Sequence, residues 1–183
     1  MNKLLQENNY VLIDNFLDKS QVNELHTIIH NDANLYPHLF ESDKQCPSSK
    51  SIYNYRWFLE ILINKTLILS EFMGESLLPT YCYARIYSHN EVLEQHIDRP
   101  ACEISITTHI GSDGTPWELY FTKPNGEIVS INLEPGQAVI YLGIKSVHWR
   151  NKFKGQHYTQ LFLHYVRSRG QYWDQYFDKN SNK

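Results

Sequence analysis

The stretch from residue 80 to residue 166 constrains the fold more than any other part of this sequence. It holds eight short segments rich in β-branched and aromatic residues, at about 80–88, 92–98, 102–110, 117–122, 127–133, 137–142, 146–150 and 157–166. Turn sequences separate them, among them GSDGTP at 111–116, PNG at 124–126 and EPG at 134–136. Eight short strands at this spacing are typical of a jelly roll or a barrel. The sequence therefore predicts a mainly β fold.

Residues 1–79 predict one strand and two helices ahead of that core. A short buried strand is expected at 9–14, and a helix begins after the polar N-cap residue Asp18, with apolar residues at helical spacing. A second helix is expected from Arg56 to Met73, because a wide apolar stripe runs through it and Gly74 follows. We expect both helices to flank the β core and to pack on one face of one sheet.

Two further segments complete the chain. Residues 32–54 are polar and irregular, and a connection of this length is typical of an active-site lid or binding loop, with a surface insertion as the alternative. The tail at 167–183 suggests a short helix that docks on the barrel, and it carries four aromatic residues, namely Tyr172, Trp173, Tyr176 and Phe177. Since no linker or repeat divides the sequence, we predict a single domain over 1–183, made of 1–79, the core at 80–166 and the tail.

Length, charge and cysteine content narrow the class of protein. At 183 residues the chain can bury a core without disulfides or metals as staples. The net charge is -3 and the sequence has no long basic cluster, so it shows no sign of the basic surface that binds nucleic acid. The sequence shows neither a signal peptide nor an apolar run of the roughly 18 residues that a membrane span needs. The spacing of its three cysteines matches no disulfide framework. We expect a soluble cytoplasmic protein with reduced cysteines and without a nucleic-acid or membrane partner.

His96, Asp98 and His148 are the candidate metal ligands. In a β-strand, residues i and i+2 point to the same face, so the side chains of His96 and Asp98 can reach one ion. A second imidazole from a distant strand, that of His148, would complete the site. Two histidines and one carboxylate leave three positions of an octahedral ion open, which is typical of non-haem Fe(II) oxygenases. The other H-x-D sequence, at 30–32, lies near the end of a predicted helix, where residues i and i+2 do not face each other.

Five segments carry a resemblance to a known family. They are YVLIDNFL at 10–17, YARIY at 83–87, LEQHIDR at 93–99, EPGQAVIY at 134–141 and HWR at 148–150. Together they make the chain resemble the 2-oxoglutarate- and Fe(II)-dependent dioxygenases, and within them the prolyl-4-hydroxylase-like group, over nearly its whole length. The resemblance implies a double-stranded β-helix in which His96, Asp98 and His148 hold Fe(II). It also implies that the cosubstrate 2-oxoglutarate chelates the iron and leaves one position for O2.

The reaction that this resemblance implies is the oxidative decarboxylation of 2-oxoglutarate to succinate and CO2, coupled to hydroxylation of a C–H bond. Iron, O2 and the cosubstrate carry the chemistry, while the protein supplies geometry and a dry pocket. No side-chain acid or nucleophile is therefore expected. A protein side chain and a small molecule both remain open as substrates, and so does the oligomeric state.

The distal carboxylate of 2-oxoglutarate needs a charged or multiply donating partner. Proteins of the resembling group commonly place a lysine or arginine on the strand after the second histidine. This sequence departs from that pattern, because His157, Tyr158 and Gln160 occupy the region. The basic group would then come from Arg150 or from Arg85.

We favour Arg150 for this role, because it alternates onto the same side of its strand as His148. Tyr87, which matches a tyrosine of the family, and Gln160 would support it. The alternative for Arg150 is a structural ion pair with an acid such as Glu103, since arginine often serves such pairs.

Other polar residues near the predicted core have both a structural and a functional interpretation. His109 and His164 lie in strand patterns and either face the interior near the iron or serve as hydrogen-bonded core groups. Arg99 and Glu103 flank the metal segment, and we favour a structural clamp over substrate contact for both. Four further histidines have no partner pattern: His26, His38, His89 and His157.

Three other functions compete with the oxygenase interpretation. A cupin-type metal protein without oxygenase activity usually draws on more histidines in an H-x-H arrangement, whereas an aspartate stands at 98 here. A related halogenase lacks the carboxylate to make room for halide, and Asp98 is present. The third is a catalytically inactive jelly-roll binding module, which would not retain iron.

Overall fold

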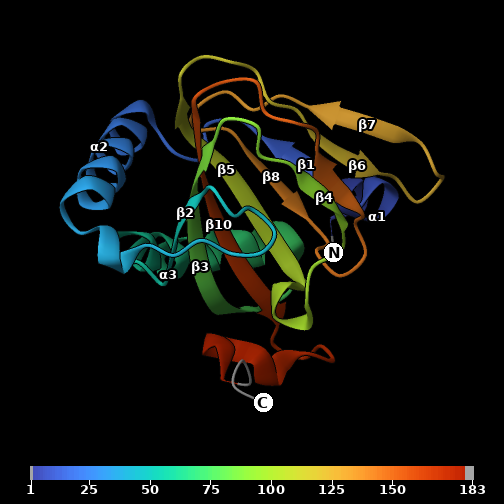
Figure 1. The fold of residues 1–183 in the computed structure, drawn as a ribbon. Coiled ribbons are helices and arrows are strands. Elements are labelled where there is room, and N and C mark those ends of the chain that lie inside the picture. Colours follow the sequence, from blue (N-terminus) through green and yellow to red (C-terminus); the bar gives the residue numbers. More distant parts are fainter. Residues whose placement is uncertain (1, 180–183) are drawn as a thin grey trace.

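The larger of two antiparallel sheets organises the fold, which is described by a computed structural model covering residues 2–179 (Figure 1). Its six strands lie in the order β1 (Tyr10–Ile13), β8 (Ala138–Tyr141), β5 (Ile104–Ser112), β10 (His157–Arg167), β3 (Leu77–Ser88) and β2 (Lys50–Tyr53). The smaller sheet has the order β4 (Leu93–His96), β9 (His148–Arg150), β6 (Leu119–Thr122) and β7 (Ile128–Ile131). The predicted jelly-roll architecture is confirmed.

The eight strands predicted from residue 80 onward correspond to β3 through β10, with ends that differ by a few residues. β10 lies at the centre of the larger sheet, between β3 and β5. Its antiparallel ladder with β3 runs from His157 opposite Ser88 to Arg167 opposite Leu77. The smaller sheet lies across from it, with β4 and β9 paired through His96 and His148.

The segment 32–54 holds more regular structure than its polar composition predicts, so the expectation of an irregular connection is wrong at both ends. α2 (Lys19–Leu35) continues into its first residues, the 3-10 helix η1 (Pro37–Leu39) follows, and β2 forms from its last residues. β2 pairs with β3 and buries Ser51 and Ile52. This tertiary pairing overrides the weak propensity of a four-residue segment. The sequence also does not predict the short helix α1 (Lys3–Asn8).

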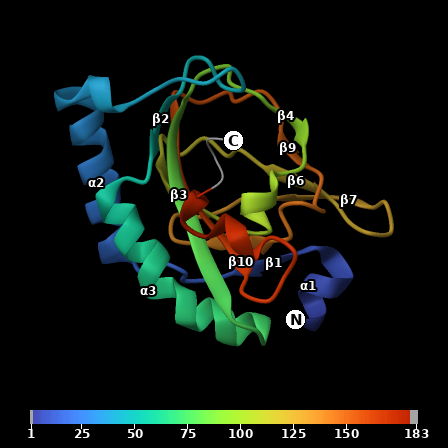
Figure 2. The same ribbon diagram turned by 90° about the horizontal axis from the view of Figure 1, so that it is seen from below.

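Helices α2 and α3 (Arg56–Met73) cover one face of the larger sheet, as predicted (Figure 2). α2 begins with a capping box in which Asp18 and Gln21 each accept a hydrogen bond from the other's backbone N–H. α3 ends at Gly74, whose φ of 69° is the left-handed conformation that glycine adopts readily. The buried stripes are Val22, Leu25, Ile29 and Ala33 on α2, and Phe58, Leu62, Leu69 and Met73 on α3.

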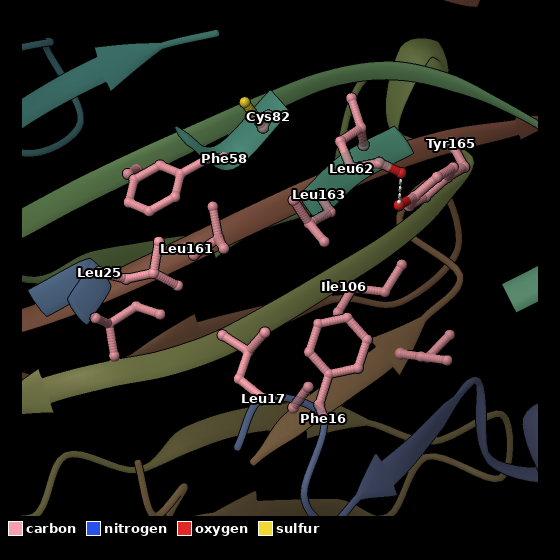
Figure 3. Close-up of a cluster of buried hydrophobic side chains, with 14 of the residues drawn as sticks. Phe16, Leu17, Leu25, Phe58, Leu62, Cys82, Ile106, Leu161, Leu163 and Tyr165 are labelled. Carbon is pink, nitrogen blue, oxygen red and sulfur yellow. Dashed lines mark hydrogen bonds between the residues drawn. The ribbon is translucent and has the colours of Figure 1, made fainter. Parts of the chain in front are cut away.

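Strand β10 sends alternate side chains to the two faces of the larger sheet. Leu161, Leu163 and Tyr165 belong to the core under the helices, and Figure 3 shows them near Phe58 and Leu62 of α3. The Tyr165 hydroxyl donates a hydrogen bond to the Leu62 carbonyl oxygen at 2.7 Å. Because Tyr165 thus satisfies its polar end within the core, the helix-facing side of β10 is well packed.

The opposite face of β10 and β5 is polar and lies between the two sheets. Gln160 on β10 and Ser105 on β5 are fully buried there. Phe162, His164 and Thr107 line an internal cavity from the same face. The polar side chains that line the cavity, those of His164 and Thr107, are therefore available to a ligand between the sheets.

The tail docks on the body of the protein through the 3-10 helix η3 (Trp173–Asp178), which contacts β3. Arg99 donates two hydrogen bonds to the Asp178 carboxylate, each at 2.8 Å, and the Tyr53 hydroxyl donates a third. This pairing agrees with the structural clamp expected for Arg99. The last residues of the predicted tail, 180–183, lie outside the described part of the chain.

We expect the clamp at Asp178 to make stability sensitive to acid. Burial alone would raise the pKa of Asp178, but hydrogen bonds from Arg99 and Tyr53 outweigh it and hold the pKa below its ordinary value. A lowered folded-state pKa contributes stability above the unfolded pKa of about 3.9, and this contribution is lost as the pH falls through the folded pKa. Asp178→Asn should therefore lower the free energy of unfolding at pH 7 by about 1–2 kcal/mol, with a smaller difference near pH 3.

Urea denaturation at pH 7 and pH 3 measures this effect. The exposed Glu24→Gln substitution on α2 serves as the control and should change stability little at either pH. A difference between Asp178→Asn and the parent protein that is equally large at both pH values would contradict the assignment of acid sensitivity to this clamp.

Two findings bear on the predicted environment of the protein. No helix within residues 2–179 is long and apolar enough to cross a membrane. The cysteines form no disulfide and all are buried: Cys46, Cys82 and Cys102.

Candidate metal centre

A cavity of about 620 Å³ lies between the two sheets and is lined from both of them. The larger sheet contributes side chains of β3, β5, β8 and β10, and the smaller sheet those of β4, β6 and β9. This volume lies in the range of about 300–1,000 Å³ that is typical of small-molecule sites. The three candidate metal ligands and Arg150 are among the residues that line it.

The structure brings His96, Asp98 and His148 together. His96 ends β4, His148 begins β9, and the two residues are directly opposite each other in the smaller sheet. The Nε2 atoms of both histidines lie 3.7 Å from Oδ1 of Asp98. Ligands about 2.1 Å from an ion and at right angles to each other lie about 3 Å apart. Only a small inward movement would therefore let the three atoms share one ion.

Backbone carbonyls fix which nitrogen of each imidazole faces Asp98. Nδ1 of His96 lies 2.8 Å from the carbonyl oxygen of Glu94, and Nδ1 of His148 lies 2.9 Å from that of Ser146. A carbonyl oxygen can only accept, so each Nδ1 carries the proton in these hydrogen bonds and each Nε2 keeps its lone pair. This is the arrangement by which metal-binding histidines are usually oriented.

Ser105 orients the carboxylate from the other side. Its hydroxyl donates a hydrogen bond to Oδ2 of Asp98 at 2.9 Å, which leaves Oδ1 facing the two imidazoles. The same hydroxyl lies 2.9 Å from Nδ1 of His164, whose pKa is lowered to about 4 mainly by burial. Neutral His164 can donate its Nδ1 proton to Ser105, and Ser105 in turn donates to Asp98.

Burial also lowers the pKa of His148, although the Asp98 carboxylate opposes the shift. The side chain of His148 is 5% exposed, whereas that of His96 is 28% exposed. A neutral imidazole is the form that binds a metal, so burial prepares His148 for this role.

Gly143 leaves room for the carboxylate of Asp98. A Cβ atom at this position would lie 2.1 Å from the carbonyl oxygen of Cys102 and 2.6 Å from Oδ2 of Asp98. The backbone N–H of Asp98 also donates to the Gly143 carbonyl at 2.9 Å. The sequence-based reasoning missed both Gly143 and Ser105. The polar and apolar alternation of ISITTHI at 104–110 is the signal that could have identified Ser105.

Arg150 is a buried cation that also lines the cavity. It is 2% exposed, and its guanidinium lies over the rings of Trp117 and Tyr158, at 4.8 and 4.9 Å from their centroids. It donates to the Trp117 carbonyl oxygen and, at 3.3 Å, to Oε1 of Gln160. Among the residues that the structure describes, no carboxylate pairs with Arg150. The alternative of an ion pair with Glu103 is wrong, because Glu103 pairs with Arg167.

The second basic candidate, Arg85, differs from Arg150 in having an acidic partner. Its guanidinium forms an ion pair with Asp43 and donates to the Ser51 hydroxyl at 3.2 Å. Nη1 of Arg85 also lies 3.4 Å from the hydroxyl oxygen of Tyr87, a residue that lines the cavity. The charge of Arg85 is therefore neutralised by Asp43, whereas no carboxylate of the described residues neutralises that of Arg150.

Gln160 is held behind Arg150. Its Oε1 accepts from Arg150, while its Nε2 donates to the hydroxyl of Thr107. Gln160 is fully buried and does not itself line the cavity. The geometry makes Gln160 a residue that positions Arg150.

The segment that contains Asp43 lies over the cavity. Residues between 39 and 53 line it, and Asp43 ties the segment to β3 through Arg85 and through the Tyr83 hydroxyl at 2.9 Å. Of the two interpretations that the sequence left open, the binding loop agrees with this placement. Of the two strand histidines, His164 lines the cavity, whereas His109 stacks on Tyr158 outside it.

No family model and no curated protein matches the sequence, but solved structures match the fold. A prolyl-4-hydroxylase from Pseudomonas putida has a TM-score of 0.73 at 14% identity, over 91% of this chain and 96% of that chain. HygX from Streptomyces hygroscopicus, solved with nickel and 2-oxoglutarate bound, has a TM-score of 0.71 at 8% identity, over 91% and 85%. The non-haem alpha-ketoglutarate-dependent carbocyclase SnoK from nogalamycin biosynthesis has a TM-score of 0.74 at 10% identity, over 92% and 85%.

These likenesses concern the fold, because the sequence identities are low. They cover about nine tenths of the chain. The resemblance found in the sequence is therefore confirmed at the level of the fold. The chain has the double-stranded β-helix fold of the 2-oxoglutarate- and Fe(II)-dependent oxygenases.

Proposed function

We propose that the protein is an Fe(II)- and 2-oxoglutarate-dependent dioxygenase that hydroxylates a C–H bond of a protein side chain or a small molecule and releases succinate and CO2. The observation that carries the proposal is the buried guanidinium of Arg150, which lines the same cavity as the metal-ligand cluster. A buried charge without a counter-charge is costly, and an anionic ligand would remove that cost.

The donor set fits iron. His96 and His148 each offer an Nε2 lone pair and Asp98 offers one oxygen, which is the set of two imidazoles and one carboxylate that non-haem Fe(II) oxygenases use. When bound, the iron would supply the O2 chemistry together with 2-oxoglutarate. The protein's part is to hold the three ligand atoms on one side, and the hydrogen bonds to Glu94, Ser146 and Ser105 do this.

Arg150 is the residue that we assign to the distal carboxylate of 2-oxoglutarate. Its planar guanidinium can donate two parallel hydrogen bonds to a carboxylate. The rings of Trp117 and Tyr158 and the amide of Gln160 restrict its orientation before any ligand arrives. Preorganisation of this kind reduces the entropy lost on binding.

Aromatic and apolar side chains form part of the cavity wall beside the metal ligands, where they would limit the access of water to the reacting groups. Tyr141 is fully buried beside His148, with ring centroids 4.8 Å apart, and Leu93, Leu119 and Phe162 line the same space. Low water content strengthens electrostatic contacts and suppresses side reactions. The solved structures support the choice of cosubstrate, since HygX was crystallised with 2-oxoglutarate bound.

The test is anaerobic loading with Fe(II) followed by titration with 2-oxoglutarate, while the visible charge-transfer band of the chelate is recorded. We expect a saturable band and the release of succinate when O2 is admitted. Iron binding without a band would favour a jelly-roll metal protein of another chemistry, and failure to bind iron would contradict the metal centre. With a substrate in hand, incorporation of one atom of ¹⁸O2 distinguishes hydroxylation from a ring closure such as the name of SnoK implies.

A further inference from the structure

A second cluster of histidines lies between α2 and the beginning of β10. His26 and His30 are four residues apart and so share one face of α2, and His157 is the first residue of β10. The ring centroids of His26 and His30 lie 4.2 Å apart, and that of His157 lies 5.3 Å from His30 and 6.0 Å from His26. His26 and His157 show no partner pattern in the sequence, but the fold brings both of them next to His30.

The three side chains are arranged as ligands of one ion would be. Each offers a ring nitrogen, and these nitrogens all lie within 4.8 Å of one another. All three residues are half-buried, so an ion from solvent can reach them. None of them lines the cavity of the candidate iron centre, which makes this a separate site.

Neighbouring groups hold two of the rings in place. Nε2 of His30 lies 2.8 Å from the hydroxyl oxygen of Thr159, and a neutral ring that donates this proton keeps a lone pair on Nδ1. The His26 ring packs so closely on Gly111 that a Cβ atom there would lie 2.5 Å from its Cδ2. A hydrogen bond to the second ring nitrogen is the usual support of a metal-binding histidine.

The electrostatic surroundings favour the neutral form of two of the rings, those of His26 and His30. Burial first, and then the neighbouring histidines and Lys50, lower the pKa of His30 to about 4, and burial with His157 lowers that of His26. Lys50 is the cation that faces the cluster, and Asp113 is an acid close to His157. Three neutral imidazoles are a donor set for a metal, whereas three charged ones would repel each other.

We propose that His26, His30 and His157 form a second metal site, which binds a first-row transition-metal dication of the Zn²⁺ type. Three imidazole nitrogens and one water give the four-coordinate arrangement that Zn²⁺ takes in His₃ sites. The all-nitrogen set distinguishes it from the iron centre, which includes a carboxylate. A bound ion would fasten α2 to the central strand β10. This proposal is independent of the proposed oxygenase function.

Zinc binding is measured by equilibrium dialysis with metal analysis, on protein from which any histidine tag has been removed. The measurement uses the Asp98→Ala/His148→Ala protein, in which the first centre cannot compete. We expect about one Zn²⁺ per chain and, at zinc 100 times its Kd, a rise in melting temperature of about 5–10 °C. Cobalt(II) should give the intense visible absorption of a four-coordinate ion.

Two single substitutions in that background remove one ligand each from different elements. His30→Gln keeps a hydrogen-bond donor for Thr159, and His157→Gln changes only the first residue of β10. Each should weaken zinc binding by at least about 100-fold, because loss of a supporting outer group alone costs 10–100-fold. The matched control is His38→Gln on η1, outside the cluster, which should bind zinc like its parent.

Two results would overturn the proposal. One is that the Asp98→Ala/His148→Ala protein binds no zinc. The other is that His30→Gln and His157→Gln, both folded by circular dichroism, bind zinc as tightly as their parent. Neither result would bear on the iron centre, because that centre shares no residue with the cluster.

Discussion

Alanine in place of Asp98 or His148 should lower turnover more than about 1,000-fold while the protein remains folded, which corresponds to a loss of about 4 kcal/mol. Each substitution removes one of three atoms that converge at 3.7 Å spacings, and the remaining two side chains cannot hold iron in the same geometry. The fold should survive, because the apolar core under α2 and α3 contains neither residue. Anaerobic iron titration and succinate release measure the effect.

The control for this pair of substitutions is His38→Ala, which removes a histidine that does not line the cavity and should leave iron binding unchanged. Circular dichroism and the melting temperature verify that each variant is folded. If both variants retained full activity with iron in excess, His96, Asp98 and His148 would not be the metal ligands.

The second large effect is expected from Arg150→Met, which should raise the Kd for 2-oxoglutarate by about 100-fold or more. Removing one partner of a buried, hydrogen-bonded charge pair costs about 2–5 kcal/mol, and 2.7 kcal/mol corresponds to 100-fold. Methionine retains much of the packing against Trp117 and Tyr158. Iron binding should not change, because Arg150 forms no hydrogen bond with the three metal ligands. Titration of the charge-transfer band gives the Kd.

Arg85→Met is the matched comparison, since the sequence left both arginines open. Arg85 already pairs with Asp43, so its loss should affect the binding loop more than the affinity for 2-oxoglutarate. Arg150→Lys should be intermediate, because lysine keeps the charge and loses the planar fork. A large loss of affinity in Arg85→Met together with normal affinity in Arg150→Met would reverse the assignment.

The periodic parts of the chain were predictable from sequence, and their contacts were not. The apolar stripe of α3 and the short strands after residue 80 each obey a simple period, so both were found. β2 was missed because its four residues become a strand only by pairing with β3. The choice between Arg150 and Arg85 depended on Asp43, which reaches β3 from a distant segment.

In the candidate site, too, local spacing was predictable from the sequence and tertiary contacts were not. The spacing of His96 and Asp98 follows from strand geometry, but the approach of His148 depends on the pairing of β4 with β9. Ser105 was missed because a polar residue in a strand is usually assigned to solvent, and in this double sheet the polar face of β5 lies inside. His157 lies more than 120 residues from His30 in sequence, so only the packing of α2 near β10 reveals that cluster.

The alternation of side chains along β10 places the residues that determine stability on one face of the strand and those that shape the cavity on the other. Leu161 and Leu163 face the helices and set stability, whereas Phe162 faces the cavity. The Phe162 ring lies 6.0 Å from that of Tyr83, which lines the same cavity from β3. A library that varies only Phe162 and Tyr83 would alter which molecules fit while the packing beneath the helices stays intact. Selectivity in this scaffold can therefore be evolved with little loss of the stability margin.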